Sequence, residues 1–257
     1  MKRLRLPGVL PVELWDAPCR GGILQGFRHR ADLPAVLAEL IDDLPRRLPG
    51  ATAADARAVA ARIDHVHLLG GGADEALRDA LTAHGVPCSL GDDALFAAAR
   101  AGLGLLAGAE APLSIDVGQT SLKLCSRAGA WRAARDLGRA PRSAPATETT
   151  ATAEATERFV LDAVLAHAPC DALLLALPCE VGDAGQLGAS SYGWRTDGAW
   201  PLRLAALAGA GAAGPMLLND AELAAAAWLR TPAAASAGAT LVLTIGFGVG
   251  GALVEAR

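Results

Sequence analysis

The stretch "SIDVGQTSLKL" (114–124) says the most about the fold. It is an apolar strand that runs into Asp116 and Gly118 and is followed by a second strand, so the region 111–138 is expected to form a hairpin of two strands. A carboxylate at a strand end can hold a hydrated Mg²⁺, and the backbone N–H groups of 118–120 can approach phosphate oxygens because Gly118 has no side chain. An ordinary hairpin with an Asp–Gly turn explains the same residues.

A second candidate is the strand–helix junction in "MLLNDAELAAAA" (216–227). Asp220 at this junction can accept a proton from a substrate hydroxyl, while Asn219 fixes the same substrate by hydrogen bonding. A plain helix cap is the alternative, since Asn and Asp are preferred at that position. Lys123, in the stretch 114–124, is one of only two lysines in an arginine-rich chain, which suggests that this position requires a lysine ammonium group. A solvated strand lysine is the alternative there.

Two glycine-rich turns complete the candidates. The backbone amides of "TIGFGVGG" (244–251) can cradle a phosphate, and the strand–glycine–helix turn "LLGGGADEAL" (68–77) can lie against an adenosine. A glycine-rich hairpin and a plain strand–helix connection, respectively, explain them equally well. The glycines concerned are Gly246, Gly248, Gly250 and Gly251 in the first turn and Gly70, Gly71 and Gly72 in the second.

Composition limits the class of protein. The 257 residues suffice for one large domain or two modest lobes, and 52% hydrophobic with 4% aromatic residues predicts a core of Ala, Leu and Val. The net charge of −4 comes without a basic block, which argues against a nucleic-acid partner. Five dispersed cysteines without metal-ligand spacing indicate reduced thiols in a cytoplasm. No signal peptide or membrane span is expected, so we predict a cytoplasmic protein without a membrane partner.

Strands and helices alternate along the chain, which predicts an α/β fold. The low-complexity segment 139–156 is expected to be a loop that enters a helix at 157–168. The other expected helices are 31–48, 52–63, a helix after 72 closed by Gly85, 93–108, 201–209 and the helix that follows Asp220.

Five motifs that occur in order over about residues 112–254 resemble the ROK sugar kinases and regulators, within the sugar-kinase/heat-shock-protein/actin ATPase superfamily. They are "SIDVGQTSLKL", "LLLALPCEV", a "GW…WPL" segment (Gly193, Trp194, Trp200, Pro201 and Leu202), "LLNDAELAAAA" and "LTIGFGVGG". The resemblance implies a two-lobed ribonuclease-H-like (actin-like ATPase) fold that uses ATP and Mg²⁺.

The resemblance also implies roles for the candidate residues. Asp220 would be the catalytic base and Asn219 a sugar contact, while Asp116 would take part in catalysis beside Mg²⁺. The residues expected to bind the nucleotide are Gly118, Gln119, Thr120 and Lys123 near one phosphate, Gly246, Gly248 and Gly250 near the next, and Gly70, Gly71 and Gly72 near the adenosine.

The order of the motifs differs from that of such kinases, in which a second lobe follows the "GFGVGG" loop. Here the region 66–108 resembles that lobe's adenosine segment and final helix. We therefore expect a circular permutant, with 1–95 plus 236–257 as the second lobe, on the adenosine side, and 96–235 as the first lobe, with the phosphate hairpin and the acceptor side. In a permutant, 66–108 would share a sheet with 240–254, and a segment near 4–14 would complete that sheet.

The sequence thus predicts an ATP- and Mg²⁺-dependent phosphotransferase that acts on a hydroxyl of a small, sugar-like metabolite. It leaves a homodimer open as the assembly. One alternative is a catalytically degenerate nucleotide-binding or sensing protein, because Phe247 stands where these kinases carry a small hydroxyl residue and their zinc-binding Cys/His cluster has no counterpart. The other is an ATP or polyphosphate hydrolase that uses water as the acceptor.

Overall fold

A computed structural model describes residues 2–12, 63–85, 87–91, 95–118, 121–134, 146–188, 199–210, 214–245 and 249–255. These residues form two mixed β-sheets and five α-helices, which confirms the expected α/β class. The helix expected at 31–48 lies outside the described residues, as does the one expected at 52–63 except for Ile63, which begins strand β3 (Ile63–Leu69).

The chain divides into two compact units. The first comprises Met1–Arg5 and Ala98–Leu223, and the second comprises Leu6–Ala97 and Ala224–Arg257. The lobes expected from the sequence differ from these units in their placement of 1–5, 96–97 and 224–235.

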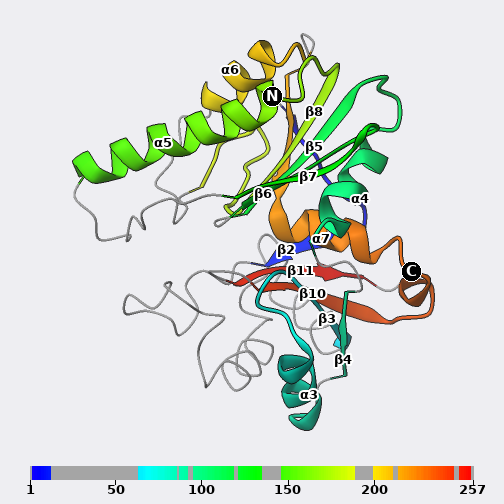
Figure 1. Cartoon of the computed structure of the whole chain (residues 1–257). Coiled ribbons are helices and arrows are strands. Elements are labelled where there is room, and N and C mark those ends of the chain that lie inside the picture. The colour runs from blue at the N-terminus through cyan, green and yellow to red at the C-terminus, as the bar shows by residue number, and fades with distance from the viewer. Residues whose placement is uncertain are drawn as a thin grey trace. The chain divides into compact units, whose positions relative to one another are not determined.

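The first unit contains a six-stranded sheet, ordered β1-β9-β8-β5-β6-β7 (Figure 1). Strands β5 and β6 form the predicted hairpin, and β7 adds a third antiparallel strand that the two-strand prediction did not include. Strands β8, β9 and β1 run parallel to β5. The strand bounds are β1 (Lys2–Arg3), β5 (Pro112–Val117), β6 (Ser121–Ser126), β7 (Gly129–Ala134), β8 (Ala172–Leu177) and β9 (Met216–Asn219).

Helices α5 (Ala146–Leu165) and α6 (Ala199–Leu207) bury side chains in one core with the first sheet. That core joins Val160 and Leu204 to alternate strand residues such as Ile115 and Leu175, as expected for a sheet whose face is covered. The expected loop at 139–156 is wrong for 146–156, which belongs to α5. Low complexity does not by itself exclude a helix, and the alanines and glutamates of the segment are strong helix formers, although its threonines are not.

The opposite surface of the same sheet is approached by α4 (Ala97–Leu105). A Cβ added at Gly102 would lie 2.0 Å from the Ser114 Oγ of β5, so only glycine permits this close packing of helix on strand. Helix α7 (Asp220–Trp228) follows β9 directly. No helix in the described parts of the chain combines the length and apolar character needed to cross a membrane.

The second unit contains a five-stranded sheet, ordered β2-β11-β10-β3-β4. In Figure 1 the red strands β10 and β11, late in the chain, lie beside the blue strand β2 and the cyan strand β3, which come early. The bounds are β2 (Val9–Val12), β3 (Ile63–Leu69), β4 (Cys88–Leu90), β10 (Ala239–Ile245) and β11 (Val249–Val254). The expectation that 66–108 shares a sheet with 240–254, and that a segment near 4–14 joins it, is confirmed.

Helix α3 (Glu75–Ala83) connects β3 to β4 in the second unit, and a short 3₁₀ helix η3 (Pro232–Ala235) precedes β10. Asp74 caps α3, because its Oδ1 accepts the Leu77 N–H at 2.8 Å. Gly85 follows the helix with a positive φ of 82°, which confirms the expected glycine stop.

Both sheets follow one plan. Beside a central strand, β5 or β10, a hairpin adds two strands on one side, and two parallel strands follow on the other; the first sheet carries β1 as an additional edge strand. The first sheet takes these five positions in chain order. The second begins with β10 and β11 and continues with β2, β3 and β4, which come earlier in the chain.

Candidate functional site

Asp116 and Lys123 face each other on neighbouring strands of the first unit. They are register partners of β5 and β6, and the Lys123 Nζ lies 3.0 Å from the Asp116 Oδ2. Only 18% of the lysine side chain and 15% of the aspartate side chain are exposed. Lys123 is therefore a largely buried partner of Asp116 rather than the solvated strand lysine of the alternative interpretation.

Gly118, just after β5, makes room for this ion pair. A Cβ at Gly118 would lie 2.6 Å from the Lys123 Nζ and 2.7 Å from the Ser121 carbonyl oxygen, so any other residue would displace one of them. Gln119 and Thr120, the remaining predicted phosphate contacts in this turn, lie outside the described residues.

Asp220 begins α7 immediately after β9 and has an unusual pKa. Burial, and after it the negative charge of Asp116, raise the pKa of its carboxyl to about 7, although the Ala221 N–H and Lys123 act to lower it. The Ala221 N–H lies 2.9 Å from the Asp220 Oδ1. A carboxyl group with this pKa can take up and release a proton near neutral pH.

Asn219 caps α7, which is the alternative that the sequence offered for it. Its Oδ1 accepts the Ala221 N–H at 2.8 Å, and its Nδ2 donates to the Cys179 carbonyl at 3.0 Å. A longer contact, at 3.4 Å, joins the same Nδ2 to the Leu177 carbonyl. Both polar atoms of the side chain thus have protein partners, and its role as a sugar contact stays a prediction.

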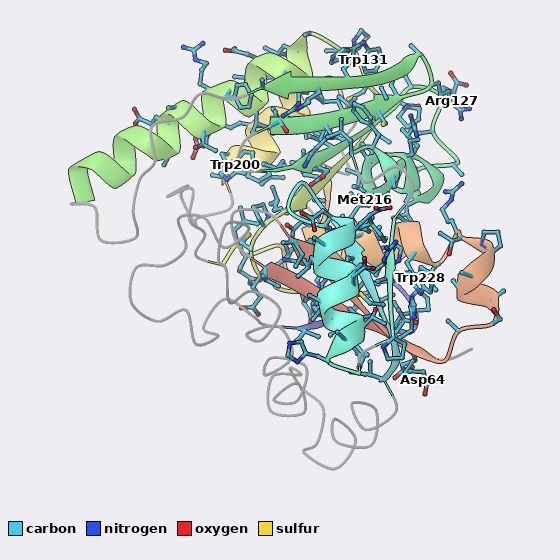
Figure 2. The ribbon with its side chains drawn as sticks, turned by 60° about the horizontal axis from the view of Figure 1, so that its bottom comes forward. Asp64, Arg127, Trp131, Trp200, Met216 and Trp228 are labelled. Carbon is cyan, nitrogen blue, oxygen red and sulfur yellow. The ribbon has the colours of Figure 1, made fainter. Side chains whose placement is uncertain are left out.

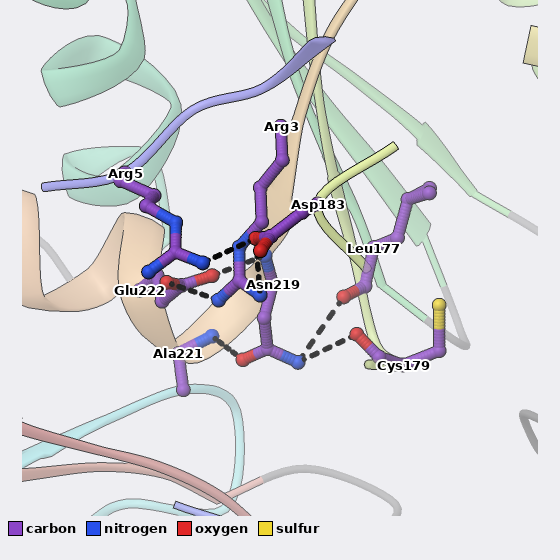
Figure 3. Close-up of polar contacts among 8 residues, drawn as sticks. All are labelled: Arg3, Arg5, Leu177, Cys179, Asp183, Asn219, Ala221 and Glu222. Atoms are coloured by element: carbon purple, nitrogen blue, oxygen red, sulfur yellow. Dashed lines mark hydrogen bonds and ion pairs between the residues drawn. The ribbon is translucent and has the colours of Figure 1, made fainter. Parts of the chain in front are cut away.

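Sequence reasoning missed a largely buried ion pair between Arg3 and Glu222, close to the junction of β9 and α7 (Figure 3). The Glu222 Oε2 accepts the Asn219 N–H at 3.0 Å, while the Oε1 binds the Arg3 guanidinium at 3.1 Å. The pattern of Asn followed three residues later by Glu is a capping-box signal that could have revealed Glu222. Arg3 gives no such signal, because it lies 219 positions from its partner.

The second unit brings the predicted adenosine turn against the end of β10. Gly70 has a φ of 98°, and a Cβ there would lie 2.5 Å from the Ile245 carbonyl oxygen. The Gly72 N–H donates to that same oxygen at 2.9 Å. Gly71 is exposed in the turn, with open space around the place of a Cβ.

The predicted phosphate turn starts where β10 ends. Gly246 and Gly248, with Phe247, lie outside the described residues, whereas Gly250 pairs with Thr244 across the β10–β11 hairpin. The start of the predicted phosphate turn therefore adjoins the predicted adenosine turn within this unit.

A second cluster missed from the sequence joins two histidines to one hydroxyl group. The Ser89 Oγ of β4 lies 2.6 Å from the His65 Nε2 and 2.8 Å from the His67 Nδ1 of β3. Trp228, at the end of α7 (Figure 2), packs on both imidazoles, with ring centroids 5.5 and 4.5 Å away. Burial lowers the pKa of His65. The alternation His-x-His on a strand places both rings on one face and was the available signal.

Scans of the sequence against protein-family models, and searches of curated proteins and of solved structures, find no match. The resemblance to ROK kinases therefore stays a prediction carried by the five sequence motifs.

Proposed function

We propose that the chain is an ATP- and Mg²⁺-dependent phosphotransferase with an acceptor hydroxyl on a small, sugar-like metabolite. The observation that carries the proposal is Asp220, a carboxyl group of pKa about 7 under the influence of the Asp116–Lys123 pair. A general base works best when its pKa lies near the working pH. Asp220 would take the proton of the acceptor hydroxyl as the phosphoryl group is transferred.

We further assign the two units to a duplicated ribonuclease-H-like (actin-like ATPase) fold in circularly permuted form. The shared strand plan supports the duplication, since β7-β6-β5-β8-β9 and β2-β11-β10-β3-β4 have the same directions. The permutation is supported by the chain order of the second sheet, which becomes that of the first if the two chain ends are joined. Termini of compact domains often lie close together, so such rearrangements are tolerated.

The donor chemistry at Asp116 suits a hydrated Mg²⁺. A carboxylate is a preferred ligand of this ion, which keeps several of its waters and takes one or two protein carboxylates. Within the described residues no three His, Cys, Asp or Glu side chains gather as a metal site. When bound, Mg²⁺ neutralises charge on the transferring phosphoryl group. Lys123 would balance the remaining carboxylate charge.

The glycine turns of the second unit would receive the nucleotide. The close approach of Gly70 to the Ile245 carbonyl leaves no room for a Cβ, and Gly71 has open space around it. The Gly72 N–H is already bonded to the Ile245 carbonyl. Backbone N–H groups in such turns form sites for anions and for close-packed ligands.

A nucleotide-binding protein without transfer activity is a second candidate, and the geometry of Asn219 favours it. The amide expected to hold the sugar is engaged with Ala221 and Cys179. An acceptor would have to displace one of these contacts or bind without it.

ATP consumption with a panel of sugars and other alcohols separates these functions, with Asp220→Asn compared against the wild type. A phosphotransferase releases ADP only with an acceptor, and the variant loses about 10²–10⁴-fold in rate. ATP binding without turnover under every acceptor identifies the binding protein. Turnover that is independent of acceptor identifies a hydrolase and contradicts the proposal.

A further inference from the structure

We propose that Arg3, in the N-terminal strand, is a positioning residue for Asp220 that acts through Glu222. This inference rests on the proposed function, in which Asp220 is the base. The contacts run from Arg3 to Glu222, from Glu222 to the backbone of Asn219, and from the Asn219 side chain to the N–H of Ala221 (Figure 3). Asp220 lies between the two residues whose backbone groups are held.

Backbone pairing fixes the place of Arg3. Strand β1 runs parallel to β9, with Arg3 in register with Leu217. The Leu4 N–H donates to the Leu217 carbonyl at 2.8 Å, and the Lys2 N–H donates to the Pro215 carbonyl at 3.3 Å. Strand β9 ends at Asn219, so this pairing sets the arginine two residues before the junction with α7.

Glu222 uses both carboxylate oxygens, one for the arginine and one for the backbone. Its side chain is 2% exposed, against 15% for Arg3. A buried carboxylate costs several kcal/mol unless it is paired and hydrogen-bonded, so the bond to the Arg3 guanidinium offsets part of the cost of burying Glu222. A charged acceptor also holds the Asn219 N–H more strongly than a neutral one.

The Asn219 side chain links the Arg3–Glu222 pair to the backbone beside Asp220. Its Oδ1 accepts the Ala221 N–H, and its Nδ2 donates to the Cys179 carbonyl in the segment after β8. The Asp220 carboxylate also accepts from the Ala221 N–H, so its orientation depends on where that group lies. A displacement of about 1 Å at a reacting group can cost about 10²-fold in rate.

Arg5 provides a matched control on the same segment. It forms an ion pair with Asp183, and the two side chains are 70% and 69% exposed. Arg3 also approaches Asp183, at 4.0 Å, but its bond to Glu222 is shorter and buried. Exposed pairs contribute little, so loss of the Arg5 charge should leave the junction unchanged.

The decisive variant is Arg3→Met/Glu222→Met. Arg3→Met alone would leave Glu222 buried without its counter-charge and would destabilise the fold, whereas apolar residues of similar size in both places are often tolerated. The double variant therefore keeps the packing but leaves the Asn219 N–H without its acceptor. The single variant Arg3→Lys, which keeps both Glu222 and the positive charge beside it, should retain most of the activity.

Three experiments are made on the full chain. They measure the thermal midpoint, the amide hydrogen exchange rate at Asn219 by NMR, and the kinetics (kcat and KM) of acceptor-dependent ADP release. In the double variant we expect a midpoint close to that of the wild type and at least tenfold faster exchange at Asn219. We also expect a kcat lower by about 10–100-fold at unchanged KM for ATP. Arg5→Met should match the wild type in all three.

A double variant that keeps the wild-type kcat, or the wild-type exchange rate at Asn219, overturns the inference while leaving the proposed function intact. If the wild-type chain shows no acceptor-dependent turnover, the proposed function fails, and the exchange rate alone decides whether Arg3 and Glu222 hold the junction.

Discussion

The ends of the two central strands differ in chemistry. In the first unit, β5 carries Asp116, which pairs with Lys123 and influences the carboxyl group of Asp220. In the second unit, β10 ends at Ile245, whose carbonyl oxygen meets the backbone of Gly70 and Gly72. The same strand order thus presents charged side chains in one unit and bare backbone in the other. The order of the strands therefore determines where the central strand of each sheet ends. The residue types at that end determine whether charged side chains or backbone groups lie there.

The glycine turn gives the largest expected effect on stability. Gly70→Ala puts a Cβ 2.5 Å from a backbone oxygen at a positive φ, so we expect a loss of about 3–5 kcal/mol in the free energy of unfolding. Gly85→Ala is the matched control, because its φ is also positive, at 82°, but no atom lies within 4 Å of the added Cβ. It should cost about 1 kcal/mol. Urea unfolding of both variants measures the difference, and equal losses would show that close approach does not distinguish Gly70.

The charged cluster makes stability depend on pH. The pKa of Asp220 is raised from 3.8 to about 7 in the folded chain, so the folded state binds more protons between these values and stability falls as the pH rises through them. We expect this carboxyl group to contribute a loss of about 2–4 kcal/mol between pH 4 and 7.

Asp220→Asn should remove that dependence. The check is the unfolding free energy of both proteins at pH 5 and 8, with Asp79→Asn, an exposed carboxylate of the second unit, as the control. If the variant has the same pH dependence as the wild type, the pKa of Asp220 is not raised in the folded chain.

Lys123→Gln tests how the ion pair acts on Asp220. The lysine charge lowers the pKa of Asp220, so its removal should raise that pKa further. The expected result is a shift of the pH–rate profile to higher pH by up to about one pH unit. Lys2→Gln, which removes the other, exposed lysine, should leave the profile in place. A downward shift would contradict the role assigned to the pair.

The smallest effect is expected at the histidine cluster of the second unit. Burial lowers the pKa of His65, so its contribution to stability is complete above the unfolded value of 6.5 and is lost as the pH falls through the folded value. His65→Gln should therefore make the thermal midpoint fall less between pH 7.5 and 5 than it does in the wild type. The exposed His84→Gln is the control, and equal behaviour of the two variants would contradict the prediction.

Local patterns predicted the parts of the fold that depend on neighbouring residues. The β5–β6 hairpin follows from alternating apolar residues around Gly118, and the start of α7 follows from the capping preference of Asn219 and Asp220. The sheet shared by β3 and β10 was expected from the order of the motifs.

Long-range pairing of charges was not predictable in the same way. The Arg3–Glu222 ion pair depends on β1 adding to β9, and a two-residue strand leaves no periodic signal. Whether Asn219 faced a ligand or its own helix was also undecided, because a cap and a substrate contact favour the same residue type. The beginning of α5 was missed because a low-complexity segment and an alanine-rich helix have similar compositions.

The two residues of β1 also protect the edge of a sheet. Without them, β9 would present the backbone of Met216 and Leu217, with which β1 pairs, as an open edge, and the strand includes the apolar Leu217 and Leu218. Open apolar edges recruit strands from other chains. Removal of residues 1–5 should therefore increase self-association of the chain, and a short peptide with the sequence of those residues, added in excess, should suppress the association.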